Sequence, residues 1–224
     1  MSPALHPVLD QYSPDCGTPF YRCVMGDGTP SIHYGIYATP GQPMREAVDA
    51  ATLRLLGNAL AMSGGVMPHE VLDLGAGAGG PAHLVADRTG ACVCCVDLCP
   101  HHATENLALA GERGLAGRIE TWTGSFDALP VAWSGRFDLV WSQEAICHAR
   151  DKAAVFREAR RALKPGGVAT FEFPHLMKLI DGNHFDTIYH EHLSYVSLTP
   201  LIEFFRTHNL TIFDVEEVDI HGGS

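Results

Sequence analysis

The sequence predicts an α/β fold in which a mostly parallel, doubly wound sheet is covered by helices on both faces. Short apolar runs alternate with helix-length segments from residue 70 to residue 220, and glycines stand where the first run ends. Parallel strands need long crossover connections, which helices supply. The 224 residues, 46% of them hydrophobic, suffice for one buried core. We therefore expect a single domain over residues 1–224.

Five strands are indicated by short runs rich in apolar and β-branched residues. In chain order these runs are EVLDLG, ACVCCVD, RIETWTG, RFDLVWSQ and VATFEF. Between them, residues 79–88, 101–113 and 151–163 have the length and composition of helices. These elements form a predicted core over residues 70–173, with a ligand crevice at the carboxyl ends of the strands.

The third helix carries both a start and a stop signal. Asp151 is a suitable N-cap because its side chain can accept from the first free N–H groups of the helix. The following Lys-Pro-Gly-Gly turn, residues 164–167, ends the helix, since proline cannot continue it and glycine adopts positive φ. One helix face collects the apolar side chains of this segment: Val155, Phe156, Ala159, Ala162 and Leu163.

Two segments stand outside the alternation of strands and helices. Residues 1–42 are rich in aromatics and proline, residues 174–197 are polar, and both are placed to cover the crevice as lids. Within residues 198–224, Pro200 in a first turn opens a helix, and LTIFDVEEVDI is interpreted as a last strand.

The charge pattern argues against two classes of partner. A formal charge of −11, from 26 acidic and 15 basic residues, gives a polyanion nothing to bind. We expect neither nucleic acid nor an anionic membrane as a partner. No apolar run reaches the roughly 18 residues of a membrane span, and the N-terminus lacks a signal-peptide pattern. These features predict a cytoplasmic location.

The seven cysteines include four in the run CVCCVDLC, from Cys92 to Cys99. Zinc sites use paired cysteine knuckles separated by a loop, whereas this run lies inside an apolar stretch. We therefore favour small buried thiols on a central strand, in a reducing compartment, over a metal site.

The stretch VLDLGAGAGG places glycines where the first strand turns into its helix. Glycine lets a ligand approach the backbone closely, and N–H groups at a helix start are available to bind it. Asp97 ends the second strand, twenty residues after Gly77, where a carboxylate can accept from ribose hydroxyls. Gly75, Gly77 and Gly80 also have the G-x-G-x-x-G spacing of dinucleotide-binding turns, so the spacing alone does not exclude NAD as the ligand. Asp73 favours a zwitterionic amino acid tail over a diphosphate, which a carboxylate repels.

This turn, together with GSFDALP, WSQEAICHARDK and RRALKPGGV, resembles the motifs of the class I S-adenosylmethionine-dependent methyltransferases, which share a Rossmann-like fold. The resemblance implies S-adenosylmethionine as cofactor. By position it assigns Asp73, Gly75, Ala76 and Gly77 to the methionine part, Asp97 and Leu98 to the ribose, Ser125 and Phe126 to the adenine, and Gln143 and His148 to the pocket wall and mouth. Many relatives carry aspartate where Ser125 stands, although a serine can still accept from the adenine amine. A structural role is an equally open interpretation of His148.

More narrowly, residues 1–170 resemble the glycine/sarcosine and sarcosine/dimethylglycine N-methyltransferases, through FYRCVMGDGTPSIHYGIY and WSQEAICHARDKAAVFREARRALKPGGV. The first of these stretches implies an N-terminal lid whose Tyr21 and Tyr34 face the cofactor, with Tyr37 less favoured. Aromatic faces attract a sulfonium, although aromatics of a docked segment can also simply fill the crevice.

Residues 173–224 instead resemble the sugar C-methyltransferases, which share the Tyr-His-Glu-His run and the final His-Gly-Gly-Ser. Methylation of carbon requires a base to remove a proton and a group to stabilise the enolate. The resemblance implies that Glu191 and His192 are the base pair and that Tyr189 is a proton donor or shuttle. His190 completes the set of predicted catalytic residues.

Several alternatives remain open at this stage. In a strand-like stretch His190 and His192 would share one face, so these two side chains could bind a metal ion with His184 as a third ligand. A polar lid loop without a catalytic role is the other alternative. We favour the interpretation without a metal. Only Lys178 is basic between residues 174 and 197, so we expect a small methyl acceptor rather than a sugar nucleotide.

N-methylation of a small amine, and a binding protein without catalysis, are the competing functions. An unpaired edge strand of the sheet can pair with a strand of another chain, so a homo-oligomer is also possible.

Overall fold

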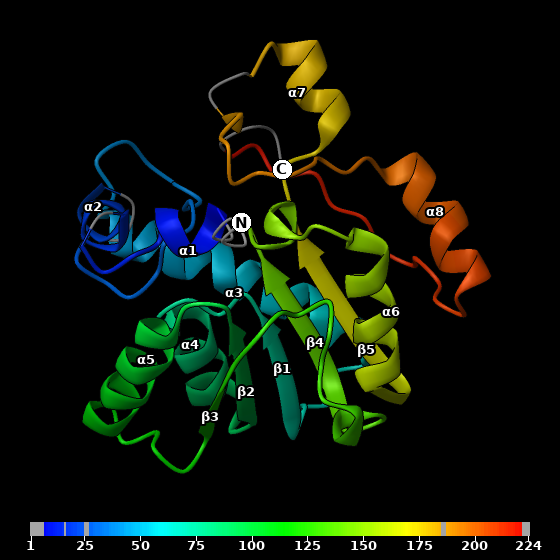
Figure 1. Cartoon of the computed structure of the whole chain (residues 1–224), viewed down its shortest axis with the longest axis horizontal. Helices are drawn as coiled ribbons and strands as arrows, with labels where there is room; N and C mark the ends of the chain where they lie inside the picture. Colours follow the sequence, from blue (N-terminus) through cyan, green and yellow to red (C-terminus); the bar gives the residue numbers. More distant parts are fainter. Residues whose placement is uncertain (1–6, 16, 25–26, 185–186, 221–224) are drawn as a thin grey trace, which may run out of the picture.

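The computed structural model describes residues 7–15, 17–24, 27–184 and 187–220 (Figure 1). In this part of the chain one parallel sheet carries five strands in the order β3-β2-β1-β4-β5. The strands are β1 (Glu70–Leu74), β2 (Cys92–Asp97), β3 (Ile119–Thr123), β4 (Phe137–Gln143) and β5 (Leu163–Glu172). The predicted α/β fold with a parallel, doubly wound sheet is confirmed.

The strand order reverses at β1, which lies between β2 and β4. At such a point the connections from two adjacent strands run in opposite directions over the sheet. This leaves a crevice between them, outside the carboxyl ends of the strands. The turn after β1 and the turn after β4 therefore face each other at this edge of the sheet.

Helices cover both faces of the sheet. On one face α3 (Met44–Met62), α4 (Gly80–Thr89) and α5 (Pro100–Glu112) pack on alternate strand residues such as Val71 and Val93. On the other face α6 (Lys152–Ala162) and α8 (Leu198–Thr207) pack on Leu72 and its neighbours. The strands are buried on both sides because each face of a parallel sheet needs a cover.

The start of α6 and its buried face follow the sequence prediction. Asp151 is the N-cap, and its Oδ1 accepts from the Ala154 N–H at 2.9 Å. The buried side chains of the helix are Val155, Phe156, Ala159 and Ala162.

The predicted turn at residues 164–167 is instead an irregularity inside β5. Leu163 already pairs with Phe137, whereas the next pair joins Val168 to Leu139, so the four intervening residues form a bulge. Gly166, at φ 79°, takes the conformation that such a bulge requires.

Segments from both parts of the chain predicted as lids gather beyond the carboxyl ends of the strands. Helices α1 (Pro7–Gln11), α2 (Gly17–Val24) and α7 (Leu176–Gly182) lie at the end of the sheet toward which β4 and β5 point (Figure 1). An isolated bridge between His175 and Val196 closes the base of the second segment. The lid roles themselves remain proposals.

The structure departs from the sequence prediction in two segments. Helix α3 was not predicted, although its 19 residues are rich in alanine and leucine. The expected last strand at residues 210–220 has no strand structure. Its Glu216 side chain bonds to Arg54 and Asn58 of α3, and a cavity of about 610 Å³ lies between this segment, β5 and α8. Apolar alternation alone does not make a strand without a partner within hydrogen-bond reach.

Cys92, Cys94 and Cys95 lie on β2, an interior strand between β3 and β1, and Cys99 is the N-cap of α5. Cys94, Cys95 and Cys99 are buried as expected, but Cys92 is exposed. The His-Gly-Gly-Ser at 221–224 and Asp186 lie outside the described residues. Within the described residues, no helix is long and apolar enough to cross a membrane.

We expect that Asp151→Ala lowers the free energy of unfolding by about 0.5–2 kcal/mol, because it removes the N-cap of α6. Urea denaturation followed by circular dichroism measures the change. Asp151→Asn is the matched control, since asparagine also caps, and the exposed ion pair with Arg157 that it removes contributes little. Equal losses in the two variants would show that the cap is not the cause.

Candidate functional site

The turn after β1 packs directly against the segment after β4. Gly75 has φ of 84°, and a Cβ at this position would lie 2.3 Å from the Cβ of Ala145. The Gly75 and Ala76 N–H groups donate to the Val96 carbonyl of β2 at 2.9 and 3.0 Å. Only glycine fits the first position of this turn, because any side chain would force the two segments apart.

Asp73 of β1 lies under this turn with an unmatched charge. Its side chain is buried, and its Oδ2 has no hydrogen-bond partner within the described residues. Burial, with the charge of Asp97 adding to it, raises the pKa of Asp73 to about 7. A buried carboxyl with an empty acceptor is suited to pairing with an ammonium group. The site therefore fits the amino end of the expected methionine nucleotide.

Asp97, at the end of β2, is held by three donors. Its Oδ2 accepts from the Gly77 N–H at 2.9 Å, and its Oδ1 accepts from the Cys99 N–H at 2.8 Å. The His102 ring lies 3.2 Å from the same Oδ1. Burial raises the pKa of Asp97, but the His102 ring and the two N–H groups outweigh burial and lower it. A fixed, ionised carboxylate remains at the position predicted for the ribose.

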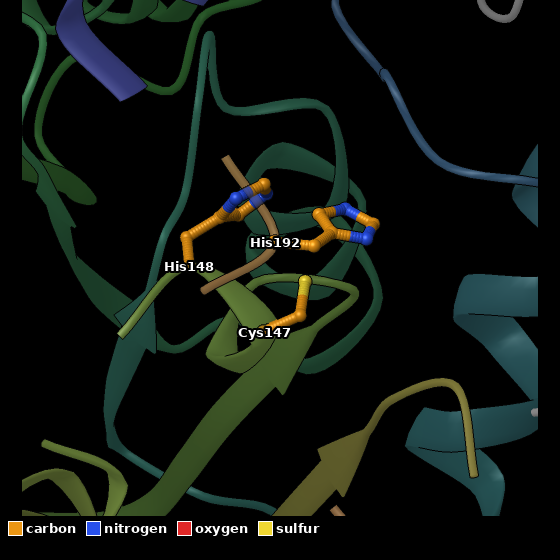
Figure 2. Close-up of side chains that lie close together, drawn as sticks. All are labelled: Cys147, His148 and His192. Carbon is orange, nitrogen blue, oxygen red and sulfur yellow. The ribbon is translucent and has the colours of Figure 1, made fainter. Parts of the chain in front are cut away.

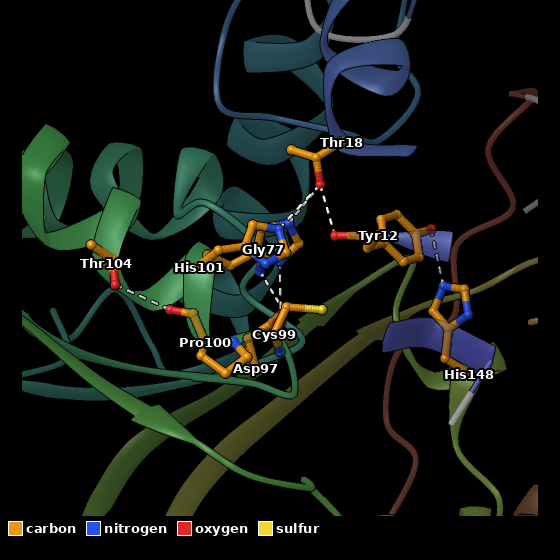
Figure 3. Close-up of polar contacts among 10 residues, drawn as sticks. Tyr12, Thr18, Gly77, Asp97, Cys99, Pro100, His101, Thr104 and His148 are labelled. Carbon is orange, nitrogen blue, oxygen red and sulfur yellow. Dashed lines mark hydrogen bonds and ion pairs between the residues drawn. The ribbon is translucent and has the colours of Figure 1, made fainter. Parts of the chain in front are cut away.

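A polar chain connects this carboxylate to the N-terminal segment (Figure 3). The Thr18 hydroxyl donates to the Tyr12 carbonyl at 2.9 Å and lies 3.3 Å from the Nε2 of both His101 and His102. The Tyr12 hydroxyl in turn lies 3.5 Å from His148 Nε2. Sequence reasoning missed Tyr12, Thr18 and His102, because the contacts that bring the N-terminal segment to His102 and His148 join residues 84 and 136 positions apart in the chain.

The residues predicted at the adenine lie beyond the glycine turn. Phe126 is buried, and its ring edge would be 3.6 Å from a Cβ at Gly75. Ser125 donates to Asp127 Oδ1 at 2.5 Å. Many relatives carry an aspartate at the position of Ser125. In this chain a carboxylate lies two residues further on, at Asp127, and the Ser125 hydroxyl bonds to it. Leu98 follows Asp97 and is half-buried.

Gln143, at the end of β4, is directed toward α3. Its Oε1 accepts from the Thr52 hydroxyl at 3.1 Å, and its side chain is buried. The next residue, Glu144, has φ of 51°, a strained conformation for a side chain of this size. Burial and the neighbouring Glu172 raise the pKa of Glu144 well above its ordinary value. Glu144 is a pocket residue that the sequence did not single out.

The predicted lid tyrosines lie in different surroundings. The Tyr21 hydroxyl accepts from Gln11 at 2.7 Å and lies 3.5 Å from Glu191 Oε1, and its ring stacks on Tyr12 with centroids 5.2 Å apart. The Tyr34 N–H lies 3.4 Å from both carboxyl oxygens of Glu144. Tyr37 is 51% exposed.

The segment that begins at Thr187 folds as turns rather than as a strand. The His192 Nδ1 lies 2.8 Å from the Thr187 carbonyl, which also accepts from the Tyr195 hydroxyl at 2.8 Å. Because a carbonyl can only accept, Nδ1 carries a proton, and in the neutral ring the lone pair is then on Nε2. The ring lies 4.5 Å from Tyr189 and 4.9 Å from His148, centroid to centroid.

Glu191 and His190 do not adopt the expected arrangement. The Glu191 carboxylate is buried and, among the described residues, contacts His190 at 3.1 Å and Tyr21 rather than the His192 ring. The side chain of His190 is 62% exposed. The alternation assumed for a strand fails because the chain turns here, so the two histidines do not share a face.

A pocket of about 60 Å³ lies between the sheet and these segments. Its lining is mostly aromatic and imidazole: Tyr12, Tyr21, Ile32, Tyr34, Glu144, Cys147, His148, Pro174, Thr187, Tyr189 and His192. Burial, with His192 adding to it, lowers the pKa of His148 to about 4, so this imidazole is neutral at pH 7. Burial raises the pKa of Tyr12 and Tyr21, so both phenols keep their protons.

Comparison with known proteins connects this site to methyl transfer. The family model described as a methyltransferase domain matches residues 72–171. A glycine/sarcosine/dimethylglycine N-methyltransferase from Actinopolyspora halophila is 34% identical over 174 residues, or 77% of this chain and 29% of that protein. The C-methyltransferase NovU from Streptomyces niveus is 36% identical over 120 residues, or 53% of this chain and 29% of that protein. The chain thus spans less than a third of these two curated relatives.

A crystal structure from Galdieria sulphuraria, assigned as a sarcosine dimethylglycine methyltransferase, superposes with a TM-score of 0.75 and 31% identity. The match covers 88% of this chain and 74% of that one. The fold is therefore shared with a protein of related sequence.

We expect that Asp73→Asn stabilises the folded protein at high pH and at the same time weakens ligand binding. The folded-state pKa of Asp73 is raised, so the ionised carboxylate opposes folding, and stability from this residue falls as pH rises from about 4 to 7. The variant should melt at a higher temperature than the wild type at pH 8 and near the wild-type temperature at pH 4. It should also bind sinefungin, an amino-bearing nucleoside, at least about ten-fold more weakly.

Differential scanning fluorimetry and calorimetry measure these two effects. Asp138→Asn is the matched control, because Asp138 is a half-buried carboxylate paired with Lys164 at the opposite ends of the strands. It should not change sinefungin affinity. Unchanged sinefungin affinity in Asp73→Asn would refute the assignment of the ammonium site.

Proposed function

The chain belongs to the S-adenosylmethionine-dependent methyltransferases, and from that premise we propose that it methylates a carbon next to a carbonyl group in a small acceptor. The observation that carries this proposal is the orientation of the His192 ring. Its Nδ1 lies 2.8 Å from the Thr187 carbonyl, so in the neutral ring the lone pair is on Nε2, and the residue lines the pocket. A neutral imidazole can act as a general base.

Phenols supply the complementary acid. Tyr12 and Tyr21 keep their protons because burial raises the pKa of each, and Tyr189 lies against His192 in the same pocket. A neutral phenol can donate to the enolate oxygen that forms when the acceptor loses its proton. These side chains stabilise negative charge where it develops.

S-adenosylmethionine supplies a methyl group carried on a positively charged sulfur. Asp73 and the glycine turn would hold its amino acid part, and Asp97 would accept from its ribose. In the reaction His192 takes a proton from the acceptor carbon, and the electron pair released forms the new bond to the methyl carbon as the bond from sulfur breaks. The protein's own work is alignment, proton removal and exclusion of water.

Sequence comparison supports the carbon acceptor only in the C-terminal part of the chain. Residues 173–224 carry the resemblance to sugar C-methyltransferases. Separately, NovU, which matches 120 residues of the chain, is named a C-methyltransferase. The pocket of about 60 Å³ has no lysine or arginine in its lining among the described residues, which favours an acceptor without a diphosphate. We therefore keep a small carbonyl compound as the proposed substrate.

N-methylation of a small amine is the second candidate, supported by a different observation. The relatives from Actinopolyspora halophila and Galdieria sulphuraria are named for glycine, sarcosine or dimethylglycine. The acidic Glu144 and the tyrosine rings of the pocket would suit an amine. An amine needs alignment but no carbon acid chemistry, so the two candidates differ in their need for a base.

We expect that His192→Ala lowers the rate of carbon methylation about 100-fold or more, the usual contribution of a general base. Sinefungin affinity should stay within about three-fold of wild type. His190→Ala is the matched control, because this exposed histidine lies two residues away in the same segment and should remain active.

Proton exchange provides a direct test of the base. Wild-type protein in D2O should exchange the acidic C–H protons of the acceptor when sinefungin occupies the donor site, and His192→Ala should not. Equal loss of turnover and sinefungin affinity in His192→Ala would instead indicate a structural role.

We expect that label from S-adenosylmethionine, incubated with the protein and a metabolite extract, appears on carbon in the product. Mass spectrometric fragmentation and two-dimensional NMR identify the labelled atom. Label on nitrogen, with His192→Ala still active, would replace the first proposal with the second.

A further inference from the structure

Three metal-ligating side chains converge at the mouth of the pocket from segments about 40 residues apart. Cys147 and His148 belong to the 3-10 helix η2 (Ile146–His148), and His192 lies on the segment that follows Thr187 (Figure 2). One ligand atom from each lies within 4.8 Å of the other two. The metal site that the sequence left open, and that we did not favour, comprised His184, His190 and His192 and did not include Cys147 or His148.

The two imidazoles are oriented in the same way. His148 Nδ1 lies 3.0 Å from the Glu191 carbonyl, and His192 Nδ1 lies 2.8 Å from the Thr187 carbonyl. Each Nδ1 therefore carries a proton, and in the neutral ring the lone pair is on Nε2. In His148 this nitrogen lies 3.5 Å from the Tyr12 hydroxyl, which a bound ion would displace. Metal-binding histidines are held in this manner, with the second nitrogen donating to a backbone carbonyl or carboxylate.

Backbone contacts fix the two segments relative to each other. The Leu193 N–H donates to the Cys147 carbonyl at 3.0 Å, and Lys152 donates to the same carbonyl at 3.3 Å and to Ser194 at 2.6 Å. These bonds flank the three side chains on both sides. The cluster is thus built by the fold and does not depend on one mobile side chain.

We propose that Cys147, His148 and His192 bind a zinc ion, and that the bound ion inhibits methyl transfer. The binding part stands on the cluster alone. The inhibitory part rests on the proposed function, because zinc would occupy the His192 lone pair that removes the proton.

The donor set selects the metal. One thiolate and two imidazoles suit Zn²⁺ and other borderline-soft ions, whereas Mg²⁺ and Ca²⁺ prefer oxygen. Zinc bonds of about 2.0–2.3 Å place tetrahedral ligands roughly 3.5 Å apart, so the three atoms need to approach by little more than an ångström. The Cys147 thiol loses its proton to solvent as its sulfur binds the ion.

The surroundings have room for the ion and a fourth ligand. The pocket of about 60 Å³, lined by all three side chains, exceeds the roughly 10–15 Å³ that one water needs. Three protein ligands leave one position for water, as in zinc sites that exchange ligands. Glu144, in the same lining, is an acidic group that can balance the remaining positive charge.

The first experiment measures binding with Co²⁺, a spectroscopic substitute for zinc. Metal-free wild-type protein should bind one Co²⁺ with a thiolate-to-metal charge-transfer band, and Zn²⁺ should displace it. Cys147→Ser should lose this band, and His148→Ala should bind Co²⁺ about 10–100-fold more weakly. Cys92→Ser, which removes an exposed thiol on β2, is the matched control and should keep the band.

Absence of a one-to-one Co²⁺ complex in wild-type protein would overturn the site. Persistence of the charge-transfer band in Cys147→Ser would also overturn it, because the thiolate would then come from another cysteine. Circular dichroism of each metal-free variant confirms that the fold is retained, and His148→Gln replaces His148→Ala if the alanine variant unfolds.

The second experiment measures inhibition, with each variant compared with its own metal-free rate. Zn²⁺ should inhibit wild-type methyl transfer, a chelator should restore it, and Cys147→Ser should need at least about ten-fold more Zn²⁺. Binding without inhibition, or a rise in rate on adding Zn²⁺, would overturn the inhibitory role. If the acceptor proves to be an amine, Co²⁺ binding still tests the site, so failure of the proposed function and failure of the metal site are distinguishable.

Discussion

The contact between Gly75 and Ala145 is the constraint on which the site depends. A Cβ at Gly75 would lie 2.3 Å from the Ala145 Cβ, so the turn after β1 and the turn after β4 approach as closely as two backbones allow. One turn carries the donor-binding groups around Asp73, and the other leads into η2 with His148. Without this contact, donor and acceptor groups would lie on separate edges of the crevice. Because the two turns lie so close together, the crevice at the point where the strand order reverses brings the donor-binding and acceptor-binding groups into one site.

Local signals in the sequence predicted most of the core. Asp151 caps its helix and Phe156 is buried because helical periodicity and capping act within a few residues. Asp97 ends β2 as expected, since apolar runs of strand length end where polar side chains begin. The strand predicted at residues 210–220 was wrong because strand pairing is not a local property. Its alternation satisfies a strand pattern, but pairing depends on a neighbouring edge that the pattern does not encode.

The pocket was only partly predictable, because its residues meet over long sequence distances. Tyr12 approaches His148 across 136 residues, and Tyr21 approaches Glu191 across 170. The decapeptide around His192 attracted attention through its residue types, but those types did not specify which side chain faces inward. The turns place Glu191 inside, against Tyr21, and leave His190 exposed. Orientation in a turn is set by tertiary contacts rather than by alternation.

Protonation connects the donor side and the acceptor side of this crevice. Burial raises the pKa of Asp73, Glu144 and the tyrosines and lowers that of His148, so most of these groups are neutral before ligands bind. A neutral lining costs less to bury than a charged one, and it becomes charged only where a ligand compensates it. An arriving ammonium would favour ionised Asp73, and a lost acceptor proton would charge His192. A neutral imidazole can also bind a cation, so the Nδ1 contact that orients His192 for proton removal would also orient it toward zinc.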